Sequence, residues 1–270
     1  FTRHFLTYAE QMQIFALLLF GLLLRKRTPE IDRKESTEKQ QERTSAHRFF
    51  TLSLAPSLAL SLFLLFSFTL ILTASRAVIA SFLVALVLTS LLLASRRMAL
   101  LTLVAALAFG GLAGYVLLAT RTSSAVNFGD DSTSRRIGYM KAGLKLIPQH
   151  PLLGVGMDAH KNHWHEWGFP GDYITHTHST PIQLAMERGL PAFGCYVWLM
   201  IAMGCWLWRS YRQQQNALAL GALAALLGFS LSSLTNYNFG DSEVVMLILF
   251  LVGLSVLRND PPPAFPQKNA

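Results

Sequence analysis

The sequence predicts an all-α, polytopic integral membrane protein. Hydrophobic residues make up 52% of the 270 residues and charged residues only 14%. The apolar residues gather in blocks close to the length of a bilayer-spanning helix, which needs about 20 residues. Within these blocks apolar and polar positions do not alternate, as they would in barrel strands. Composition and pattern together exclude a soluble fold.

We expect about seven transmembrane helices, at residues 8–24, 49–74, 78–93, 98–118, 190–208, 216–234 and 244–257. The first four lie in one membrane block, residues 1–118, and the last three in a second, residues 190–257. Between the blocks lies a polar segment, residues 119–189. The chain ends in a Pro-rich tail, residues 258–270, which we expect to be disordered.

Basic residues mark the cytoplasmic side, because loops on that side carry an excess of Lys and Arg. They cluster in the loop at residues 25–48 and at Arg96, Arg97, Arg209, Arg212 and Arg258. Residues 119–189 then form one large periplasmic loop. This topology explains the net charge of +8, so we expect membrane lipids and no nucleic acid as partners.

The start of the chain predicts further helices before residue 1. The first residue is Phe1, and no signal peptide precedes the first span. An odd number of spans combined with an exported N-terminus also indicates that further helices precede residue 1.

The periplasmic loop holds six of the eight histidines together with Trp164 and Trp167, and this aromatic content predicts an ordered region. Residues 135–149 predict an amphipathic helix with one apolar side, formed by Ile137, Met140, Leu144 and Ile147. Two placements of this helix remain open. It lies on the membrane surface, with Lys141 and Lys145 facing lipid phosphates, or it packs on its own domain.

Three kinds of catalytic or metal site are disfavoured in this loop. The histidines at 160, 163 and 165 have no cysteine beside them and lack the i, i+4 spacing of a helical zinc pair, so we expect no metal and no other cofactor. Asp130 and Asp131 are adjacent, which suits a turn better than a glycosidase pair. Ser179 lacks the GxSxG context of a serine nucleophile.

His178 stands before a helix that we expect to begin near Pro181. Gln183 and Glu187 follow at i, i+4 spacing, so both lie on one face of that helix. From these residues alone, His178 either caps the helix or belongs to a polar site held against the membrane.

Three blocks together resemble the O-antigen ligase and polymerase superfamily. They are Arg135 with Tyr139, the HPLLGVG segment at 150–156, and a third block formed by His178, Gln183, Glu187, Gly189 and Gly194. FLTYAEQ at 5–11 and Ser75-Arg76-Ala77 are similar to further family segments. The resemblance covers nearly the whole chain but only the C-terminal two-thirds of a typical member. Ser179 and Tyr139 depart from it, since asparagine and tryptophan are frequent there.

The resemblance implies a GT-C-like membrane glycosyltransferase, inverting and metal-independent, at the periplasmic face of the bacterial inner membrane. Its donor would be a glycan on undecaprenyl diphosphate. His178 would be the general base, because a neutral imidazole can take a proton from a sugar hydroxyl. Arg76 and Arg135, with Arg136 as the alternative, would bind the donor diphosphate. Gln183, Glu187 and Asp241 would support the site.

Three acceptors are compatible with this resemblance. An O-antigen ligase in lipopolysaccharide biosynthesis uses a lipid A core sugar, a polymerase uses another glycan, and an oligosaccharyltransferase uses an exported protein. We favour the ligase, because of the Tyr-Ala-Glu-Gln start, the moderate exported loop and the lack of an additional soluble domain. A membrane transporter is the alternative of another class. A transporter would carry ionisable residues near the middle of several spans. The spans of this chain are almost free of charge.

Overall fold

The computed structural model of the chain describes residues 2–24, 56–93, 96–120, 131–171, 176–214 and 216–257. Over these residues the regular structure is helical, with no strand. The helices are α1 (Thr2–Leu23), α3 (Pro56–Leu72), α4 (Arg76–Leu93), α5 (Arg96–Thr120), α6 (Asp131–Leu146), α7 (His160–His163), α8 (Thr180–Gln214), α9 (Ala217–Ser232), the short 3-10 helix η2 (Asn238–Gly240) and α10 (Ser242–Leu257). The predicted basic loop at 25–48 and the tail at 258–270 lie outside the described residues.

The chain is an all-α polytopic membrane protein, as its sequence predicts. Judged by length and composition, three of the described helices can cross a membrane: α1 over Phe5–Leu23, α5 over Arg96–Tyr115, and α8. Four shorter apolar helices, α3, α4, α9 and α10, accompany them. Each of the seven predicted spans therefore corresponds to one of these apolar helices.

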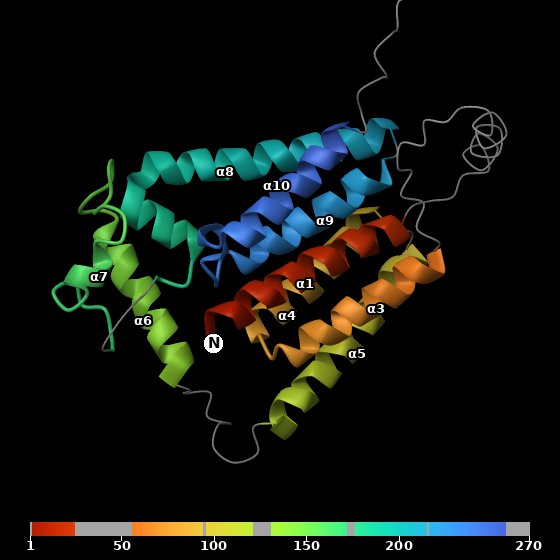
Figure 1. Cartoon of the computed structure of the whole chain (residues 1–270), viewed down its shortest axis with the longest axis horizontal. Helices are drawn as coiled ribbons and strands as arrows, with labels where there is room; N and C mark the ends of the chain where they lie inside the picture. The colour runs from red at the N-terminus through yellow and green to blue at the C-terminus, as the bar shows by residue number, and fades with distance from the viewer. Residues whose placement is uncertain are drawn as a thin grey trace, which may run out of the picture.

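Helix α1 occupies the middle of the bundle, between α3 on one side and α9 and α10 on the other (Figure 1). Its most extensive packing is against α9, where a Cβ atom added at Gly21 would lie 2.3 Å from the Cα of Gly221. Because lipid is as apolar as a helix surface, such close backbone packing is a main source of helix association in membranes.

A row of aromatic rings joins α1 to α3, α4 and α5. The ring centroids of Phe20 and Phe63 are 5.8 Å apart, those of Phe63 and Phe82 6.5 Å, and those of Phe82 and Phe109 5.7 Å. All three pairs are tilted, an arrangement that aromatic rings favour over a face-to-face sandwich. The row links four helices through the middle of the bundle.

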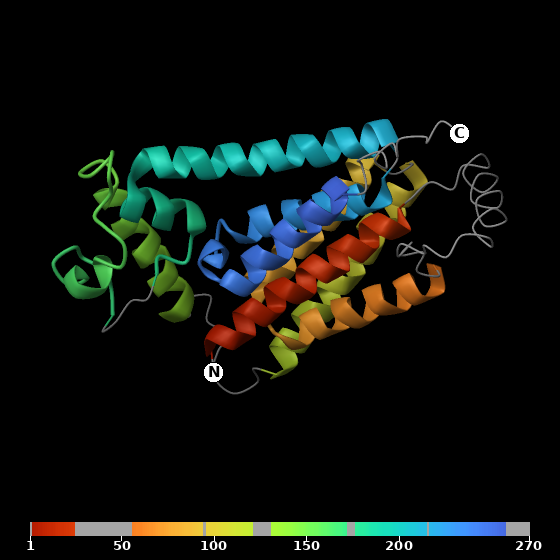
Figure 2. The same ribbon diagram turned by 45° about the horizontal axis from the view of Figure 1, so that its top comes forward.

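Helix α6 lies with α7 beyond one end of the bundle (Figures 1 and 2). It runs from Asp131 to Leu146, so it begins and ends earlier than the predicted 135–149. The predicted apolar side is only partly packed against the protein, because its Ile137 and Leu144 are 47% and 54% exposed. Tyr139, Ala142 and Leu146 are buried instead and pack with Phe169 and Met186.

A glycine explains which side of α6 is buried. A Cβ atom added at Gly143 would lie 2.8 Å from Cγ2 of Ile182 and 3.1 Å from Cγ2 of Thr177. The helix therefore approaches α8 most closely along the side that carries the small residues Ala142 and Gly143. The side that carries the bulkier residues Ile137 and Leu144 faces outward. Hydrophobic periodicity does not report this difference in steric access.

Helix α8 bends sharply near its start, and the two arms of the bend are visible in Figures 1 and 2. Gly189 has φ 82° and ψ 170°, which is not helical, and Pro191 follows it. Proline has no N–H to donate to the carbonyl four residues earlier, which is that of Glu187. The predicted helix starting near Pro181 and the predicted span 190–208 are thus the two arms of one bent helix.

The HPLLGVG segment supplies the hydrogen bonds that this bend removes. The N–H of Val155 donates to the Met186 carbonyl at 2.9 Å, and the N–H of Gly156 donates to the Glu187 carbonyl at 3.0 Å. In return, the N–H of Leu190 donates to the Pro151 carbonyl at 2.7 Å. Buried backbone groups need such partners. The two motifs, far apart in sequence, therefore form one interlocked structure.

We predict that Gly189→Ala destabilises the protein by at least ~2 kcal/mol, because only glycine adopts this backbone region without strain. In addition, the new Cβ atom would lie 2.1 Å from the Leu152 carbonyl oxygen. The check is the thermal unfolding midpoint of the purified full-length protein in detergent. Gly194→Ala in the same helix is the control, since its Cβ atom would meet nothing within 4 Å. Equal midpoints for the two variants would contradict the role of the bend.

Candidate active site

His178 stands two residues before α8 in a left-handed backbone conformation, with φ 55°. This conformation costs a residue other than glycine on the order of 1–3 kcal/mol and is often found at functional sites. Neighbouring contacts hold it in place. The N–H of His178 donates to Nδ1 of His176 at 3.3 Å, and the N–H of Thr177 donates to Oε1 of Gln183 at 2.7 Å.

Thr180, the first residue of α8, fastens this loop to the membrane bundle. Its N–H donates to the carbonyls of Ser233 at 2.9 Å and Asn236 at 3.1 Å. Its hydroxyl lies 3.1 Å from the Asn236 carbonyl and 3.0 Å from Oδ1 of Asn238. Both acceptor segments belong to the connection between α9 and α10. The position of His178 is therefore set by that connection as well as by α8.

The imidazole of His178 lies between two rings. Tyr139 of α6 stacks on it with centroids 5.9 Å apart and planes 18° apart, and His176 meets it edge-on at 4.2 Å. Its Nδ1 atom is buried and has no hydrogen-bond partner among the described residues. Burial lowers the pKa of His178 to about 3, and the charges of His176 and Arg136 act in the same direction. The imidazole is therefore neutral at neutral pH.

The charge of one arginine, from α6, acts on this histidine, and the charge of a second arginine, from α4, acts on the first. Arg136 of α6 is half-buried, and Arg76, at the start of α4, is exposed. The pKa of the Arg136 guanidinium is lowered, first by burial and then by the charge of Arg76. The same Arg136 charge acts on His178. Of the two arginines that the sequence left open, Arg136 is half-buried and its charge acts on His178, whereas Arg135 is exposed.

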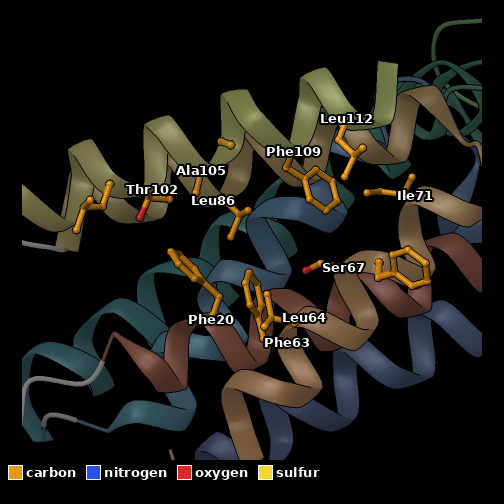
Figure 3. Close-up of a pocket in the computed structure, with 13 residues that line it drawn as sticks. Phe20, Phe63, Leu64, Ser67, Ile71, Leu86, Thr102, Ala105, Phe109 and Leu112 are labelled. Atoms are coloured by element: carbon orange, nitrogen blue, oxygen red, sulfur yellow. The ribbon is translucent and has the colours of Figure 1, made fainter. Parts of the chain in front are cut away.

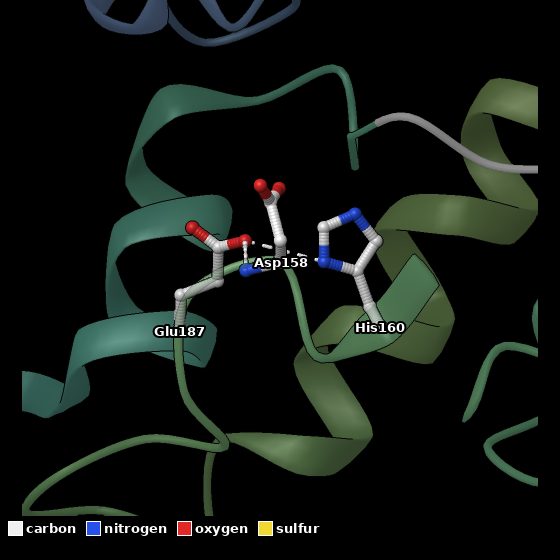
Figure 4. Close-up of side chains that lie close together, drawn as sticks. All are labelled: Asp158, His160 and Glu187. Atoms are coloured by element: carbon white, nitrogen blue, oxygen red, sulfur yellow. Dashed lines mark hydrogen bonds and ion pairs between the residues drawn. The ribbon is translucent and has the colours of Figure 1, made fainter. Parts of the chain in front are cut away.

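Gln183 and Glu187 point into the protein, with exposures of 1% and 4%. Gln183 holds the loop before His178 through Thr177. Oε1 of Glu187 accepts the N–H of Asp158 at 2.9 Å and lies 3.2 Å from Nδ1 of His160, as the dashed lines in Figure 4 show. Both side chains thus fasten loops around the bend in α8.

The same three residues, Asp158, His160 and Glu187, offer ligand atoms within 4.8 Å of one another, a spacing that a metal ion could use. Other contacts explain the cluster. The Asp158 carboxylate pairs with Nζ of Lys161 at 2.6 Å. His160 is fully buried beside the Glu187 carboxylate, so it is a packed, paired histidine. His163 pairs with Glu166 at 2.9 Å.

Asp241 lies at the start of α10, where its Oδ2 accepts the Thr7 hydroxyl of α1 at 2.9 Å. Close to it is Glu10 of α1, only 1% exposed, with Asn236 and Asp241 as its polar neighbours. Glu10 belongs to the FLTYAEQ segment, but it was not predicted to be a site residue. The signal was present, because an ionisable residue inside an apolar span suggests function by default.

Tyr237 is a second residue that the sequence analysis missed. Its ring lies 5.8 Å from that of His176. Burial raises the pKa of its phenol, as does the carboxylate of Glu187, while Arg188 acts in the opposite direction. No local pattern marks Tyr237, because its neighbours come from other parts of the chain.

A family model described as O-antigen ligase matches residues 60–197. The chain belongs to the O-antigen ligase family. Members of this family are membrane glycosyltransferase-like enzymes, which use a lipid-linked glycan donor and a glycan acceptor. The match includes Arg76, Arg136 and His178. No curated protein matches the chain.

An apolar cavity of about 570 Å³ lies between α1, α3, α4 and α5, and all of its lining residues except Phe20 fall within the matched residues 60–197. Figure 3 shows side chains of α3 and α5 facing each other across it, among them Phe63 and Phe109. Ser67 and Thr102 are the polar residues of its lining. A second pocket, of about 820 Å³, lies near Asp241, with Thr7, Tyr8 and Glu243 in its lining.

We predict that acid destabilises this O-antigen ligase family member through His178. Its folded-state pKa is about 3, against roughly 6.5 in an unfolded chain, so between these values the unfolded state binds more protons. The contribution of His178 to the free energy of unfolding is therefore complete above pH ~6.5, and it is lost as the pH falls toward 3. Between pH 7.5 and 4.5 the unfolding midpoint should fall more in the wild type than in His178→Gln. Substitution of the exposed His150 by Gln should leave the wild-type pH dependence unchanged.

A second prediction concerns metal. Because the carboxylates of Asp158 and Glu187 already have partners, we expect EDTA to leave the unfolding midpoint of the purified protein unchanged. Metal analysis of the dialysed protein provides the check. One zinc or other divalent ion per chain, lost with EDTA together with a fall in the midpoint, would overturn this prediction and identify the cluster as a metal site.

Proposed function

We propose that the protein is an O-antigen ligase of the bacterial inner membrane. It transfers a polysaccharide from undecaprenyl diphosphate to a sugar hydroxyl of the lipid A core at the periplasmic face. Family membership supports the class of reaction. The observation that supports the site is that the charge of Arg136 acts on a buried, neutral histidine, His178, while the charge of Arg76 acts on Arg136.

In this reaction His178 takes the proton from the attacking core hydroxyl. The hydroxyl oxygen forms a bond to the anomeric carbon of the donor, on the face opposite the diphosphate, so the configuration is inverted. The bond between that carbon and the diphosphate oxygen breaks, and the electron pair leaves with undecaprenyl diphosphate. Arg76 and Arg136 stabilise the negative charge that gathers there, as guanidinium groups do for phosphates.

The donor also prepares the base. A pKa of about 3 leaves His178 neutral but makes it a weak proton acceptor, since a base works best with a pKa near the working pH. A diphosphate bound at Arg136 offsets the positive charge that helps to lower this pKa. The pKa of His178 then rises when the donor is in place. Proton transfer is thereby favoured in the complex that can react.

The cavity between α3 and α5 has the chemistry to take an apolar chain. Its lining is almost wholly aliphatic and aromatic, and of its two polar residues Thr102 uses its hydroxyl within its own helix, on the Met98 carbonyl at 2.9 Å. We assign this cavity to part of the polyprenyl tail of the donor. Ile71 of the lining lies just before the turn that leads to Arg76, so the tail and the diphosphate would be bound close together.

We predict that His178→Ala in the full-length protein abolishes ligation, because general base catalysis contributes about 10²–10⁴ in rate. The full-length gene is deleted in its host, and the strain is complemented with wild type, His178→Ala or, as a matched control, His150→Ala. Extracted lipopolysaccharide is then separated on a gel. Polymer bands should be absent in the deletion strain and with His178→Ala, with the core intact, and present with the other two.

Other outcomes separate the alternatives. Core carrying a single repeat unit in the deletion strain would indicate a polymerase. An unchanged lipopolysaccharide ladder with loss of glycan from exported proteins would indicate an oligosaccharyltransferase. Full ligation by His178→Ala at normal expression would refute the assignment of the base.

A further inference from the structure

His176 makes a contact that decides the backbone geometry of the candidate base. Its Nδ1 accepts the N–H of His178 at 3.3 Å. A backbone N–H only donates, so this Nδ1 carries no proton, and the neutral ring carries its proton on Nε2. His178 is one of three residues other than glycine with a positive φ among the described residues. The contact therefore acts on the strained residue of the site.

The ring of His176 also fills the space beside the base. It meets the His178 ring edge-on, with centroids 4.2 Å apart and planes at 74°, and the Tyr237 ring lies 5.8 Å from it. Tyr139 covers the His178 ring by stacking. The base is thus enclosed by α6, by the connection between α9 and α10, and by His176 between them.

We propose that His176 is a positioning residue for His178. Its Nδ1 holds the His178 backbone in the left-handed conformation, and its ring keeps the imidazole against Tyr139. The inference deepens the proposed function, because it rests on His178 as the base that takes the acceptor proton. His176 itself touches neither donor nor acceptor in this account.

Two substitutions separate the hydrogen bond from the ring. His176→Asn places an amide oxygen near the position of Nδ1 and so keeps an acceptor for the His178 N–H. His176→Phe keeps a flat ring and removes the acceptor. The same pair at His150, an exposed histidine of the same region, controls for a general effect of these changes.

The first readout is glycan transfer by the purified full-length protein in lipid nanodiscs, with isolated undecaprenyl-diphosphate-linked glycan and lipid A core. We expect His176→Phe to lower kcat by about 10²-fold, the order of loss seen when a catalytic group is displaced by roughly 1 Å. The KM for the donor should stay near the wild-type value. His176→Asn should recover most of kcat, and both His150 variants should match the wild type.

The pH profile gives a signature that a loss of folding would not produce. The groups that act on or contact His178 are His176 on its own loop and Tyr139 and Arg136 from α6, and Tyr237 from the α9–α10 connection lies beside His176. In acid the His176 ring takes up a second proton, and its charge then lowers the pKa of His178. Neither Asn nor Phe can carry this charge. The acid limb of kcat should therefore move to higher pH in both His176 variants.

A second measurement does not depend on activity. Residue-resolved hydrogen exchange of the His178 amide should be faster in His176→Phe than in the wild type, by about tenfold, and close to the wild-type rate in His176→Asn. Wild-type kcat in His176→Phe, or unchanged exchange at His178, would overturn the inference. No transfer by the wild-type protein, with the exchange pattern as expected, would instead refute the proposed function and leave the positioning contact established.

Discussion

The bend of α8 at Gly189 and Pro191 joins the membrane bundle to the polar region around His178 through backbone hydrogen bonds. Pro191 cannot bond to the Glu187 carbonyl, and the HPLLGVG segment supplies the missing donors. Glycine is needed in both the HPLLGVG segment and the bend. Cβ atoms at Gly154 and Gly189 would lie 2.3 and 2.1 Å from the facing backbone atoms. Without this junction the first arm of α8 would continue the membrane span, and the loop carrying His178 would be directed elsewhere.

The short first arm of α8 is hydrogen-bonded to the rest of the site at its start and along its inner face. At its start, Thr180 binds the connection between α9 and α10. Along its inner face, Gln183 and Glu187 bind the loops at Thr177 and Asp158. These buried polar groups have partners, which is the condition under which their burial does not destabilise the fold. The result is a rigid support for a histidine in an unfavourable backbone conformation.

The electrostatics of the site follow from this support. Burial keeps His178 neutral, the charge of Arg136 from α6 acts on it, and the charge of Arg76 from α4 acts on Arg136. Like charges brought together in a partly buried space favour an anion between them. The pairing of a neutral base with a cationic site therefore depends on how closely α4, α6 and the His178 loop pack.

Part of the site could be predicted because its pattern is local. Gln183 and Glu187 share a helical face, and that helix begins at Thr180, one residue from the expected start. Glu10 was overlooked, although a carboxylate within an apolar run is a visible signal. The side of α6 that is buried could not be predicted, because Ile137 and Leu144 satisfy the helical period as well as Tyr139 and Leu146 do. Periodicity identifies an apolar stripe, but steric fit selects which stripe is buried.

The number of apolar helices and the all-α class followed from composition and block length, because bilayer thickness sets the length of a span and the absence of water requires internal hydrogen bonding. The burial of Arg136 next to the exposed Arg135, the packing of Tyr139 and His176 on the His178 ring, and the nearness of Tyr237 to His176 came only from the tertiary structure. Each depends on distances between segments that are far apart along the chain. Such distances arise from helix packing and from the bend of α8, and no local pattern of residues encodes them.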